Sequence, residues 1–585
     1  MTATETKTNA RTATIPMQIN GLAVEAQPGA TILDAARQAG VRIPTLCHLA
    51  GLFPSGACRM CIVEVEGRPG LIPSCAFPAE AGLKVSTRSP RVLNARKTII
   101  ELLLASHPFD CLTCNRNLHC ELQSLAAEYN IQNVPFQGKT RHHYIDFSSP
   151  SIVRDPDKCI LCGRCVRVCE EVQGVSAIDF TRRGFDTMVL PAFEKDLSET
   201  TCVNCGQCVL ACPVGALHEA SDIERVISTM QEGKKVMVAQ AAPAIRISLG
   251  EFFGLPPGAN VTGKVAAALR RMGFKHVFDT DFGADLTIME EGTELVQRIK
   301  NGGKLPLFTS CCPGWVKFAE HNFPELLPNL STCKSPQQMM GAVIKTYLAQ
   351  KEGIKPEDIF VVSVMPCTAK KYEAERPEMS RDGVQDVDVV LTNREFARLL
   401  DHFGINFGLL PEEEFDPLLG TTSGSGDIFA ASGGVMESAL RTAYNLVTGK
   451  DLKKLEFQEV RGIEGVKEAT VDLGGTKLKV AVVNTLGNAR RLAEKIQRGE
   501  ADYHFVEVMA CPGGCAGGGG QIYGLDKERI LQRIQSLYQL DLARPIRQSY
   551  KNPRIQALYQ DYLEAPGSHR SHELLHTRYE RRARR

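Results

Sequence analysis

A run of closely spaced cysteines occurs twice in this sequence and limits what the chain can fold into. The pattern C-x2-C-x2-C-x3-C spans residues 159–169 and returns over residues 202–212. Chance does not repeat such a spacing, which is typical of segments that hold two [4Fe–4S] clusters, with each fourth cysteine bound to the other cluster. One cluster is therefore expected to use Cys159, Cys162, Cys165 and Cys212. The other is expected to use Cys202, Cys205, Cys208 and Cys169.

The whole set of cysteines is unevenly distributed, and this also indicates metal binding. Of 21 cysteines in 585 residues, fifteen precede residue 221. The first residues lack the pattern of an export signal, and no apolar run approaches the roughly 18 residues of a membrane span. We therefore expect a cytoplasmic protein without a membrane segment, where thiols bind metals or act in catalysis rather than form disulfides. Lys plus Arg (68) balances Asp plus Glu (67), so nucleic-acid binding is not expected.

The segment 15–92 is expected to form a small β-grasp domain. It reads as two strands joined by a turn at Asn20-Gly21, followed by a helix that opens near Thr31. Four thiolates with one tight pair suit a [2Fe–2S] cluster, although the first gap is longer than in the plant-type spacing. A zinc knuckle is the alternative. The four predicted ligands, in the spacing C-x10-C-x2-C-x13-C, are Cys47, Cys58, Cys61 and Cys75.

The segment 93–150 has three cysteines and an upstream histidine. The spacing is H-x3-C-x2-C-x5-C, and the missing fourth ligand is predicted to be His107. An imidazole in place of a thiolate would make a [4Fe–4S] cluster less negative and raise its potential. The alternative is a surface histidine without a metal. The three cysteines are Cys111, Cys114 and Cys120.

From residue 222 the sequence alternates between strand and helix patterns, which predicts an α/β domain with largely parallel sheet over 222–540. Ligands in such folds gather beyond the carboxyl ends of the strands. Six apolar segments are candidate strands: Lys235–Gln240, Leu305–Thr309, Ile359–Met365, Val387–Leu391, Leu478–Val483 and Tyr503–Met509. A candidate helix covers Asn393–Phe403.

Cysteines follow three of these candidate strands and predict one more cofactor, buried in the sheet. They are Cys311-Cys312, Cys367, and Cys511 with Cys515. The glycine run in CPGGCAGGGG would let the backbone approach a bulky group, and a flexible loop is the alternative. Cys333 lacks this placement and is interpreted as an ordinary buried thiol.

Three segments resemble the signature motifs of [FeFe]-hydrogenases. They are TSCCPGWVKF (309–318), MPCTAKKYE (365–373) and EVMACPGGCAGGGGQ (507–521). The order of the preceding cysteine modules is similar to the long clostridial type, with a two-cluster ferredoxin-like domain over 151–221. Residues 541–585 resemble the small subunit that some members of the family carry separately.

The resemblance implies an enzyme that interconverts H2 with protons and electrons at an H-cluster. This cofactor is a [4Fe–4S] cluster joined to a diiron subsite with CO, cyanide and dithiolate ligands, which maturation proteins install. One [2Fe–2S] and three accessory [4Fe–4S] clusters would carry the electrons. The implied H-cluster ligands are Cys312, Cys367, Cys511 and Cys515, the last of which would also bridge to the diiron subsite.

The resemblance also implies a proton route that begins at the thiol of Cys311. Burial would raise the pKa of this thiol and keep it protonated, as a proton donor requires. The route continues through Glu291, Ser331 and Glu294, with Arg298 near the surface. Glu291 and Glu294 share a face of a predicted helix, and without the resemblance they would be read as a solvated helix edge.

The remaining implied residues surround the diiron subsite. Lys370 would bond a cyanide ligand, with Glu373 nearby. Ala369 stands where several members have serine, so a hydrogen bond to the dithiolate is in doubt. The methionines among the lining residues are also compatible with plain core packing. The expected lining residues are Ala242, Pro243, Ser335, Gln337, Met365 and Met509.

The electron acceptor and the partner proteins are inferred from motifs that the sequence does not contain. The chain has no G-x-G-x-x-G dinucleotide fingerprint after a strand and no evident flavin site. Reduction of NAD(P) would therefore need flavin and iron–sulfur subunits in a hetero-oligomer, and ferredoxin is the other expected partner. Two other kinds of protein are the alternatives: a non-catalytic hydrogenase-like electron-transfer or iron–sulfur assembly protein, and a hydrogen sensor with a signalling domain. The presence of Cys311 and Lys370 argues against the non-catalytic protein, and no signalling domain is evident.

Overall fold

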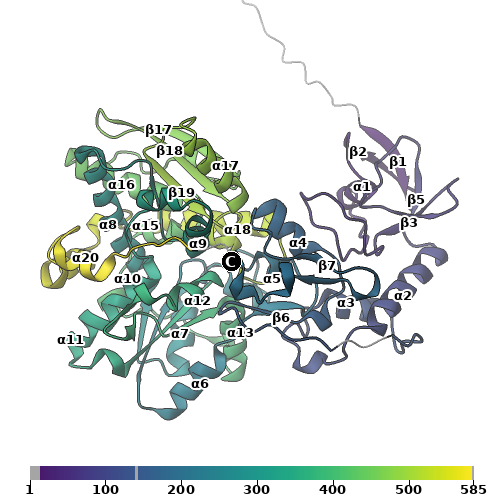
Figure 1. The fold of residues 1–585 in the computed structure, drawn as a ribbon, viewed down its shortest axis with the longest axis horizontal. Helices are drawn as coiled ribbons and strands as arrows, with labels where there is room; N and C mark the ends of the chain where they lie inside the picture. Colours follow the sequence, from purple (N-terminus) through teal and green to yellow (C-terminus); the bar gives the residue numbers. More distant parts are fainter. Residues whose placement is uncertain (1–13, 139–141, 583–585) are drawn as a thin grey trace, which may run out of the picture.

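The computed structural model describes residues 14–138 and 142–582. The start of the chain, on which the expectation about an export signal rests, lies outside these residues, as do the last three residues of the small-subunit-like segment. Figure 1 shows two parts, the cysteine-rich modules on the right and the large α/β domain on the left. Within the described ranges, no helix combines the length and apolar composition that a membrane span requires.

The first module is a five-stranded sheet with the strand order β2-β1-β5-β3-β4 and one covering helix. Asn20 and Gly21 both have positive φ and connect β1 to β2, as the two-residue hairpin turn requires. Thr31 caps α1 in a capping box with Asp34, which confirms the predicted helix start. The elements are β1 (Ile15–Ile19), β2 (Leu22–Ala26), α1 (Ile32–Gln38), β3 (Ile62–Val65), β4 (Leu71–Pro73) and β5 (Lys84–Ser86).

Short helices and two-stranded ribbons form the next two modules. The cysteines there lie mostly in loops, with left-handed glycines at Gly163 and Gly206 opening the short helices that follow. The strands pair as antiparallel ribbons, β6 with β9 and β7 with β8. The elements are α2 (Pro90–Ala105), α3 (Glu121–Glu128), β6 (Ile152–Arg154), α4 (Arg164–Arg167), β7 (Asp179–Thr181), β8 (Met188–Leu190), α5 (Gln207–Ala211) and β9 (Leu217–Glu219).

The large domain has two four-stranded sheets, both largely parallel, as predicted for an α/β domain. The first sheet, in the order β11-β10-β13-β16, is all parallel. The second, in the order β12-β19-β18-β17, is parallel except for the edge strand β17. The strands are β10 (Val236–Ala241), β11 (His276–Asp279), β12 (Leu307–Phe308), β13 (Ile359–Met365), β16 (Val389–Thr392), β17 (Val466–Asp472), β18 (Lys477–Asn484) and β19 (Phe505–Met509), with a separate ribbon of β14 (Ser380–Arg381) and β15 (Val384–Gln385).

The 22-residue helix α8 (Thr280–Asn301) joins the hydrophobic cores of the two sheets. Phe282 and Leu286 pack into the core of the first sheet, while Ile288 and Leu295 pack into that of the second. The other helices are α6 (Ile223–Glu232), α7 (Thr262–Met272), α9 (Pro313–Asn322), α10 (Pro336–Val343), α11 (Ala349–Glu352), α12 (Ala369–Ala374), α13 (Asn393–His402), α14 (Pro417–Gly420), α15 (Gly424–Asp427), α16 (Gly434–Thr448) and α17 (Leu486–Gln497).

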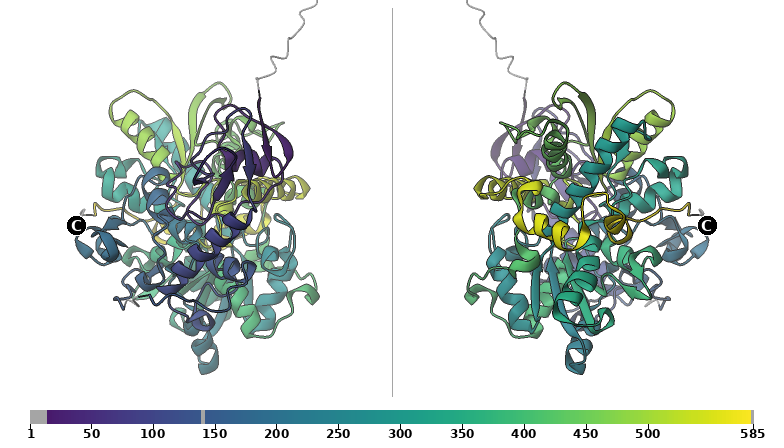
Figure 2. Two further views of the ribbon diagram at one scale, coloured as in Figure 1. Left: turned by 90° about the vertical axis from the view of Figure 1, so that its right-hand side faces the viewer. Right: turned by 90° about the vertical axis from the view of Figure 1, so that its left-hand side faces the viewer.

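The C-terminal segment runs from α18, beside the cysteine-rich modules, to α20, on the opposite side of the large domain (Figures 1 and 2). It contains α18 (Lys527–Ala543), α19 (Pro553–Leu558) and α20 (His569–Leu575). Its apolar residues Ile555, Leu558 and Leu575 are fully or almost fully buried in the core of the first sheet. The segment is therefore part of the folded domain rather than a loose tail.

Candidate active site

Cysteines that follow three strands surround a cavity between the carboxyl ends of the two sheets. Cys311 and Cys312 follow β12, and Cys511 follows β19, both in the second sheet, whereas Cys367 follows β13 in the first. The cavity measures about 80 Å³, and the loop of Cys515 contributes to its lining. The predicted site residues that line it are Cys311, Cys312, Cys367, Cys511, Cys515, Ala242, Pro243, Gln337, Met365, Lys370 and Met509.

The glycine run after Cys515 lets one loop pack directly on two others. A Cβ atom on Gly518 would lie 2.1 Å from the carbonyl oxygen of Pro366, and one on Gly519 would lie 2.2 Å from that of Cys205. Both distances are far below contact, so only glycine fits. The loop is fixed against protein backbone, which excludes the flexible-loop interpretation.

The cavity's donor set fits an iron–sulfur group. Burial raises the pKa of Cys511 well above the usual thiol value and raises that of Cys367 to about 12. Thiols that converge in this way would stay protonated without a metal, and bound iron is what would hold them as thiolates. The residues to hold such a cluster are Cys312, Cys367, Cys511 and Cys515.

A network of hydrogen bonds fixes Lys370 at the cavity wall. Its Nζ atom donates to the carbonyl oxygen of Cys311 at 3.1 Å and to Oε2 of Glu373 at 2.8 Å. Ser335 and Gln337 donate to the same carboxylate oxygen, at 2.9 and 3.2 Å. Burial would lower the pKa of Lys370, but Glu373 outweighs it and the net shift is upward, so the ammonium keeps its charge. Ser335 and Glu373 thus lie behind Lys370 rather than on the cavity surface.

The predicted proton-route residues form a line from the cavity toward the surface. Burial raises the pKa of the Cys311 thiol well above its usual value, as expected. Glu291 is buried on α8, and its carboxylate oxygens have no hydrogen-bond partner among the described residues. Burial raises the pKa of Glu291 to about 8, the range in which a carboxyl group can both give and take a proton near neutral pH.

Beyond Glu291 the line continues through direct hydrogen bonds. Ser331 Oγ donates to Oε2 of Glu294 at 2.9 Å. Arg298 Nη2 donates to Oε1 of Glu294 at 2.6 Å, and this arginine side chain is 14% exposed. A solvated helix edge does not describe Glu291, which is 1% exposed.

The second ferredoxin-like motif packs directly against the cavity loops. Thr368 Oγ1 donates to the carbonyl oxygen of Asn204 at 2.7 Å, and Gln207 Nε2 donates to that of Gly517 at 3.0 Å. Asn204 and Gln207 flank Cys205, whose backbone touches Gly519. A cluster held by this motif would therefore be the neighbour of the catalytic cavity.

Two outer modules contact residues around one of the two predicted ferredoxin-like clusters, the one assigned to Cys159, Cys162, Cys165 and Cys212. Arg116, in the module that contains His107, donates to the carbonyl oxygen of Cys212, and Gly215 leaves no room for a Cβ beside the sulfur of Cys114. Arg167, which follows Cys165, donates to the carbonyl oxygen of Cys47 in the first module. This predicted cluster is thus reached from two sides.

A zinc site and an iron–sulfur cluster in the first module would require different distances between the four cysteine sulfurs. One zinc ion holds four ligands about 3–4 Å apart. Cys61 and Cys75 have sulfurs 3.3 Å apart. Nevertheless, no three of the four cysteines bring their sulfurs within 4.8 Å of one another in the part of the chain that the structure describes. The wider spacing favours an iron–sulfur cluster over a single zinc ion.

In the next module, burial lowers the pKa of His107, which favours the neutral imidazole that a metal ligand requires.

Sequence reasoning missed a set of residues beside the proton route. His576 Nε2 lies 3.1 Å from Oε2 of Glu290, and Tyr559 donates to Oε1 of Glu290 at 2.5 Å. Cys333, interpreted as an ordinary buried thiol, is buried but lies 3.9 Å from Oε2 of Glu294. Tyr559 and His576 come from far along the chain, so no local spacing signals them.

Family comparisons agree with this site. Residues 235–519 match the family described as "Iron only hydrogenase large subunit, C-terminal domain", and residues 527–582 match "Iron hydrogenase small subunit". The earlier matches are "2Fe-2S iron-sulfur cluster binding domain" over 12–90 and "4Fe-4S dicluster domain" over 158–216. Between them, residues 96–135 match "NADH-ubiquinone oxidoreductase-G iron-sulfur binding region".

Two relatives are similar over almost the full length. "NADP-reducing hydrogenase subunit HndD" of Solidesulfovibrio fructosivorans is 51% identical, over 97% of this chain and 99% of its own. "Iron hydrogenase 1" of Clostridium pasteurianum is 43% identical, over 96% of this chain and 99% of its own. "Cytosolic iron-sulfur assembly component 3" of Mus musculus is 34% identical over 66% of this chain and 83% of its own.

A solved structure of a variant of the [FeFe]-hydrogenase HydA1 from Chlamydomonas reinhardtii is 43% identical, with a TM-score of 0.56. It covers 62% of this chain and 99% of that one. The fold and the cavity define an iron–sulfur oxidoreductase with a buried catalytic cluster. The chain belongs to the iron-only, or [FeFe], hydrogenase family.

Family membership confirms the predicted fold class and the predicted activity. The chain is a hydrogenase that interconverts H2 with protons and electrons, with [2Fe–2S] and [4Fe–4S] domains ahead of the catalytic domain. The domain limits, the ligand sets and the proton route remain predictions.

Proposed function

We propose that this chain is the hydrogen-activating subunit of a cytoplasmic, multisubunit NADP-linked hydrogenase. The observation that carries this is the full-length similarity to the NADP-reducing hydrogenase subunit, at 51% identity. The match of residues 96–135 to an iron–sulfur region of NADH-ubiquinone oxidoreductase also supports nicotinamide-linked partners. Because the sequence has no dinucleotide fingerprint, flavin-containing partner subunits would bind the NADP.

Inside the subunit, electrons would pass between one [2Fe–2S] cluster, three accessory [4Fe–4S] clusters and the H-cluster. The contacts of Arg116 and Arg167 suggest two outer clusters that feed one inner cluster. The contact between Gly519 and the backbone of Cys205 suggests the last step to the catalytic cavity. Partners that dock at the outer modules would then exchange electrons without approaching the cavity.

When bound, the diiron subsite supplies reversible splitting of H2, and the side chains around it move the proton. Cys311 would pass its thiol proton to Glu291 and take the new proton at its sulfur, and the raised pKa of Glu291 suits this relay. Ser331 would hand it to Glu294, and Arg298 would hold Glu294 at the surface end. Lys370 would orient a ligand of the subsite through its ammonium group, held by Glu373.

An iron–sulfur assembly role is the competing proposal, since an assembly component is also a relative. The cavity favours catalysis, because a pure scaffold has no use for a free thiol and a buried ammonium beside the cluster ligands. Cys311 and Lys370 both line the cavity here.

Co-purification of the native protein tests the proposal. Subunits that bind flavin should accompany the chain, and the complex should oxidise H2 with NADP. The chain alone should oxidise H2 with an artificial dye but not with NADP. NADP reduction by the isolated chain, or full physiological activity with ferredoxin alone, would disprove the partner-subunit proposal.

A further inference from the structure

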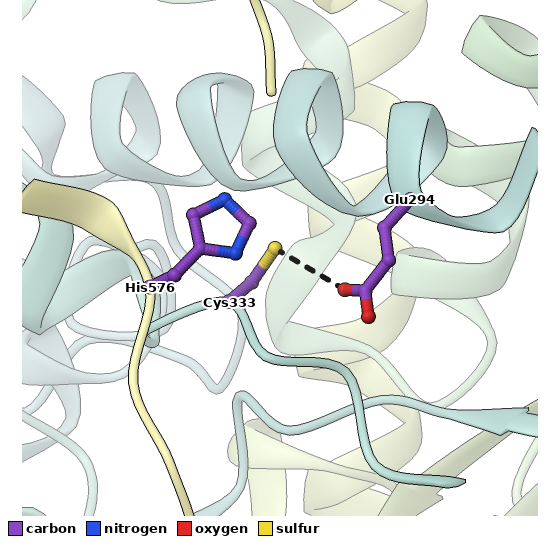
Figure 3. A group of neighbouring side chains, drawn as sticks. All are labelled: Glu294, Cys333 and His576. Carbon is purple, nitrogen blue, oxygen red and sulfur yellow. Dashed lines mark hydrogen bonds between the residues drawn. The ribbon is translucent and has the colours of Figure 1, made fainter. Parts of the chain in front are cut away.

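Three side chains from three distant segments converge beside the proposed proton route (Figure 3). Glu294 comes from α8, Cys333 from the loop before α10, and His576 from the C-terminal segment after α20. One ligand atom of each lies within 4.8 Å of the other two, and Cys333 Sγ is 3.9 Å from Glu294 Oε2. The figure shows the three groups pointing toward one another.

Carboxylate, thiolate and imidazole are the three ligand types that zinc uses in proteins. Around one tetrahedral zinc ion the ligand atoms are about 3–4 Å apart, so the present spacing needs only a small contraction. We propose that Glu294, Cys333 and His576 form a binding site for one zinc-like divalent cation, with water as the fourth ligand, and that its occupation slows proton transfer through Glu294.

The surroundings supply the supporting contacts that a metal-bound histidine needs. His576 Nε2 lies 3.1 Å from Oε2 of Glu290, and Nδ1 lies 2.7 Å from the hydroxyl of Thr332. A hydrogen bond from Nε2 to a carboxylate orients the ring and makes Nδ1 a better ligand. The Thr332 hydroxyl can rotate away, which leaves Nδ1 free for the cation. Glu290 is held in turn by Tyr559.

The local charge favours a divalent cation over a bare thiolate. Burial, together with Glu294, Glu291 and Glu290, raises the pKa of Cys333. The same carboxylates attract a cation, and the Zn–S bond would form as the thiol releases its proton to water. Arg298 is the cation already paired with Glu294, through Oε1. On the side of Cys333, Oε2 accepts only from neutral donors, the Ser331 hydroxyl and the backbone N–H of Thr332.

The site is close enough to solvent to be filled in the finished protein. The side chains of Glu294 and His576 are 13% and 6% exposed. The exposed imidazole of His572 lies against the ring of His576, with 3.8 Å between ring centres, and offers a first contact for an arriving cation. Once the predicted ligands hold their clusters, Cys311 and Cys333 are the two thiols left over.

The slowing of turnover rests on the proposed function, in which Glu294 carries protons. A cation on Oε2 would take the oxygen that accepts from Ser331 and would prevent Glu294 from being protonated there. Binding itself does not depend on that role, and the experiment separates the two.

The test uses the anaerobic holoenzyme titrated with zinc chloride. Zinc content after desalting should report one ion, and X-ray absorption at the zinc edge should report one sulfur and three nitrogen or oxygen ligands. H2 uptake with an artificial dye should fall as the ion binds, while the infrared bands of the H-cluster stay unchanged.

Cys333→Ala and His576→Gln should each weaken zinc binding at least about tenfold and make H2 uptake insensitive to zinc, with activity in its absence retained. His569→Gln, which changes an exposed histidine at the start of α20, is the matched control and should behave as wild type. The more exposed His576 variant covers the case in which Cys333→Ala misfolds. Zinc binding that neither variant affects would overturn the site. If zinc binds with one sulfur ligand but H2 uptake is not slower, the proposed inhibition at Glu294 is wrong. Full H2 uptake without zinc would show that the hydrogenase function holds in either case.

Discussion

Lys370 Nζ lies 2.8 Å from Oε2 of Glu373, and both side chains are nearly buried. Two neutral donors, Ser335 and Gln337, point to the same oxygen. A buried ammonium so held keeps its charge and position, which is what a group that orients a cofactor ligand requires. Glu373 is therefore a positioning residue that acts through Lys370.

Glu373→Gln should destabilise the protein because it leaves the buried ammonium without a counter-charge. Loss of one partner of a buried pair costs about 3–5 kcal/mol, and the remaining amide hydrogen bond will offset part of it. The midpoint of thermal unfolding, followed by the visible absorption of the clusters, should fall by several degrees. The infrared bands of cyanide should also shift, because Lys370 moves. Glu375→Gln, an exposed neighbour on the chain, is the control, and an equal effect there would refute the pairing argument.

Cys311→Ala should abolish H2 turnover, by at least about a hundredfold, because general acid–base groups contribute that much or more. The cofactor should still assemble, since Cys311 is not among the predicted ligands, and the infrared bands of CO and cyanide should persist. Cys333→Ala, which removes the other left-over thiol, should keep its activity. H2 turnover near the wild-type rate in Cys311→Ala would show that Cys311 does not relay protons.

Glu291 should make the two directions of catalysis depend on pH in opposite ways. Its pKa is raised to about 8, chiefly by burial, so at neutral pH it is protonated. Formation of H2 needs Glu291 as a donor and should decline as pH rises through about 8, whereas H2 oxidation needs it as an acceptor and should increase. Steady-state rates in both directions measure this, and Glu291→Gln should lose both activities along with the pH dependence.

The raised pKa of Glu291 should also make the free energy of unfolding depend on pH. Between the ordinary glutamate value and about 8, native Glu291 holds a proton that the unfolded chain has lost. The free energy of unfolding should therefore decrease as pH rises across this window, and the decrease should be smaller in Glu291→Gln. A steeper decrease in the variant would contradict the buried, protonated state.

Sequence alone was enough for the parts of the fold that rest on local rules. The turn at Asn20-Gly21, the helix start at Thr31 and the cysteines after β12, β13 and β19 follow from residue spacing and chemistry. Two edge strands were not among the predicted ones: β11, which has four residues, and β17, in which exposed residues outnumber buried ones. The strand order within the two sheets was not predicted, because the spacing of strands along the chain does not encode which of them pair.

The neighbourhood of Cys333 could not be predicted for a related reason. It depends on residue 576 returning to residue 294 across almost half of the chain, through the docking of the C-terminal segment. Resemblance identified Glu294 as a proton carrier but said nothing of what lies beside it. Only three-dimensional packing brings the thiol, the imidazole and the carboxylate together.

The contact between Gly519 and the backbone of Cys205 gives a test of the last electron-transfer step. A Cβ on Gly519 would lie 2.2 Å from the Cys205 carbonyl oxygen and 2.8 Å from Gly206 Cα, so Gly519→Ala must push the cluster-bearing loop away from the cavity. Overpacking of this kind costs about 1–3 kcal/mol. A wider gap between the clusters should also slow electron transfer.

Rapid-freeze EPR after mixing with H2 should therefore show slower reduction of the accessory clusters in Gly519→Ala, with the H-cluster infrared bands in place. Gly70→Ala is the matched control, because its Cβ would meet nothing within 4 Å and its backbone is not in the left-handed region. It should reduce its clusters at the wild-type rate. Unchanged reduction in Gly519→Ala, in protein that carries all its iron, would mean that electrons leave the cavity by another path.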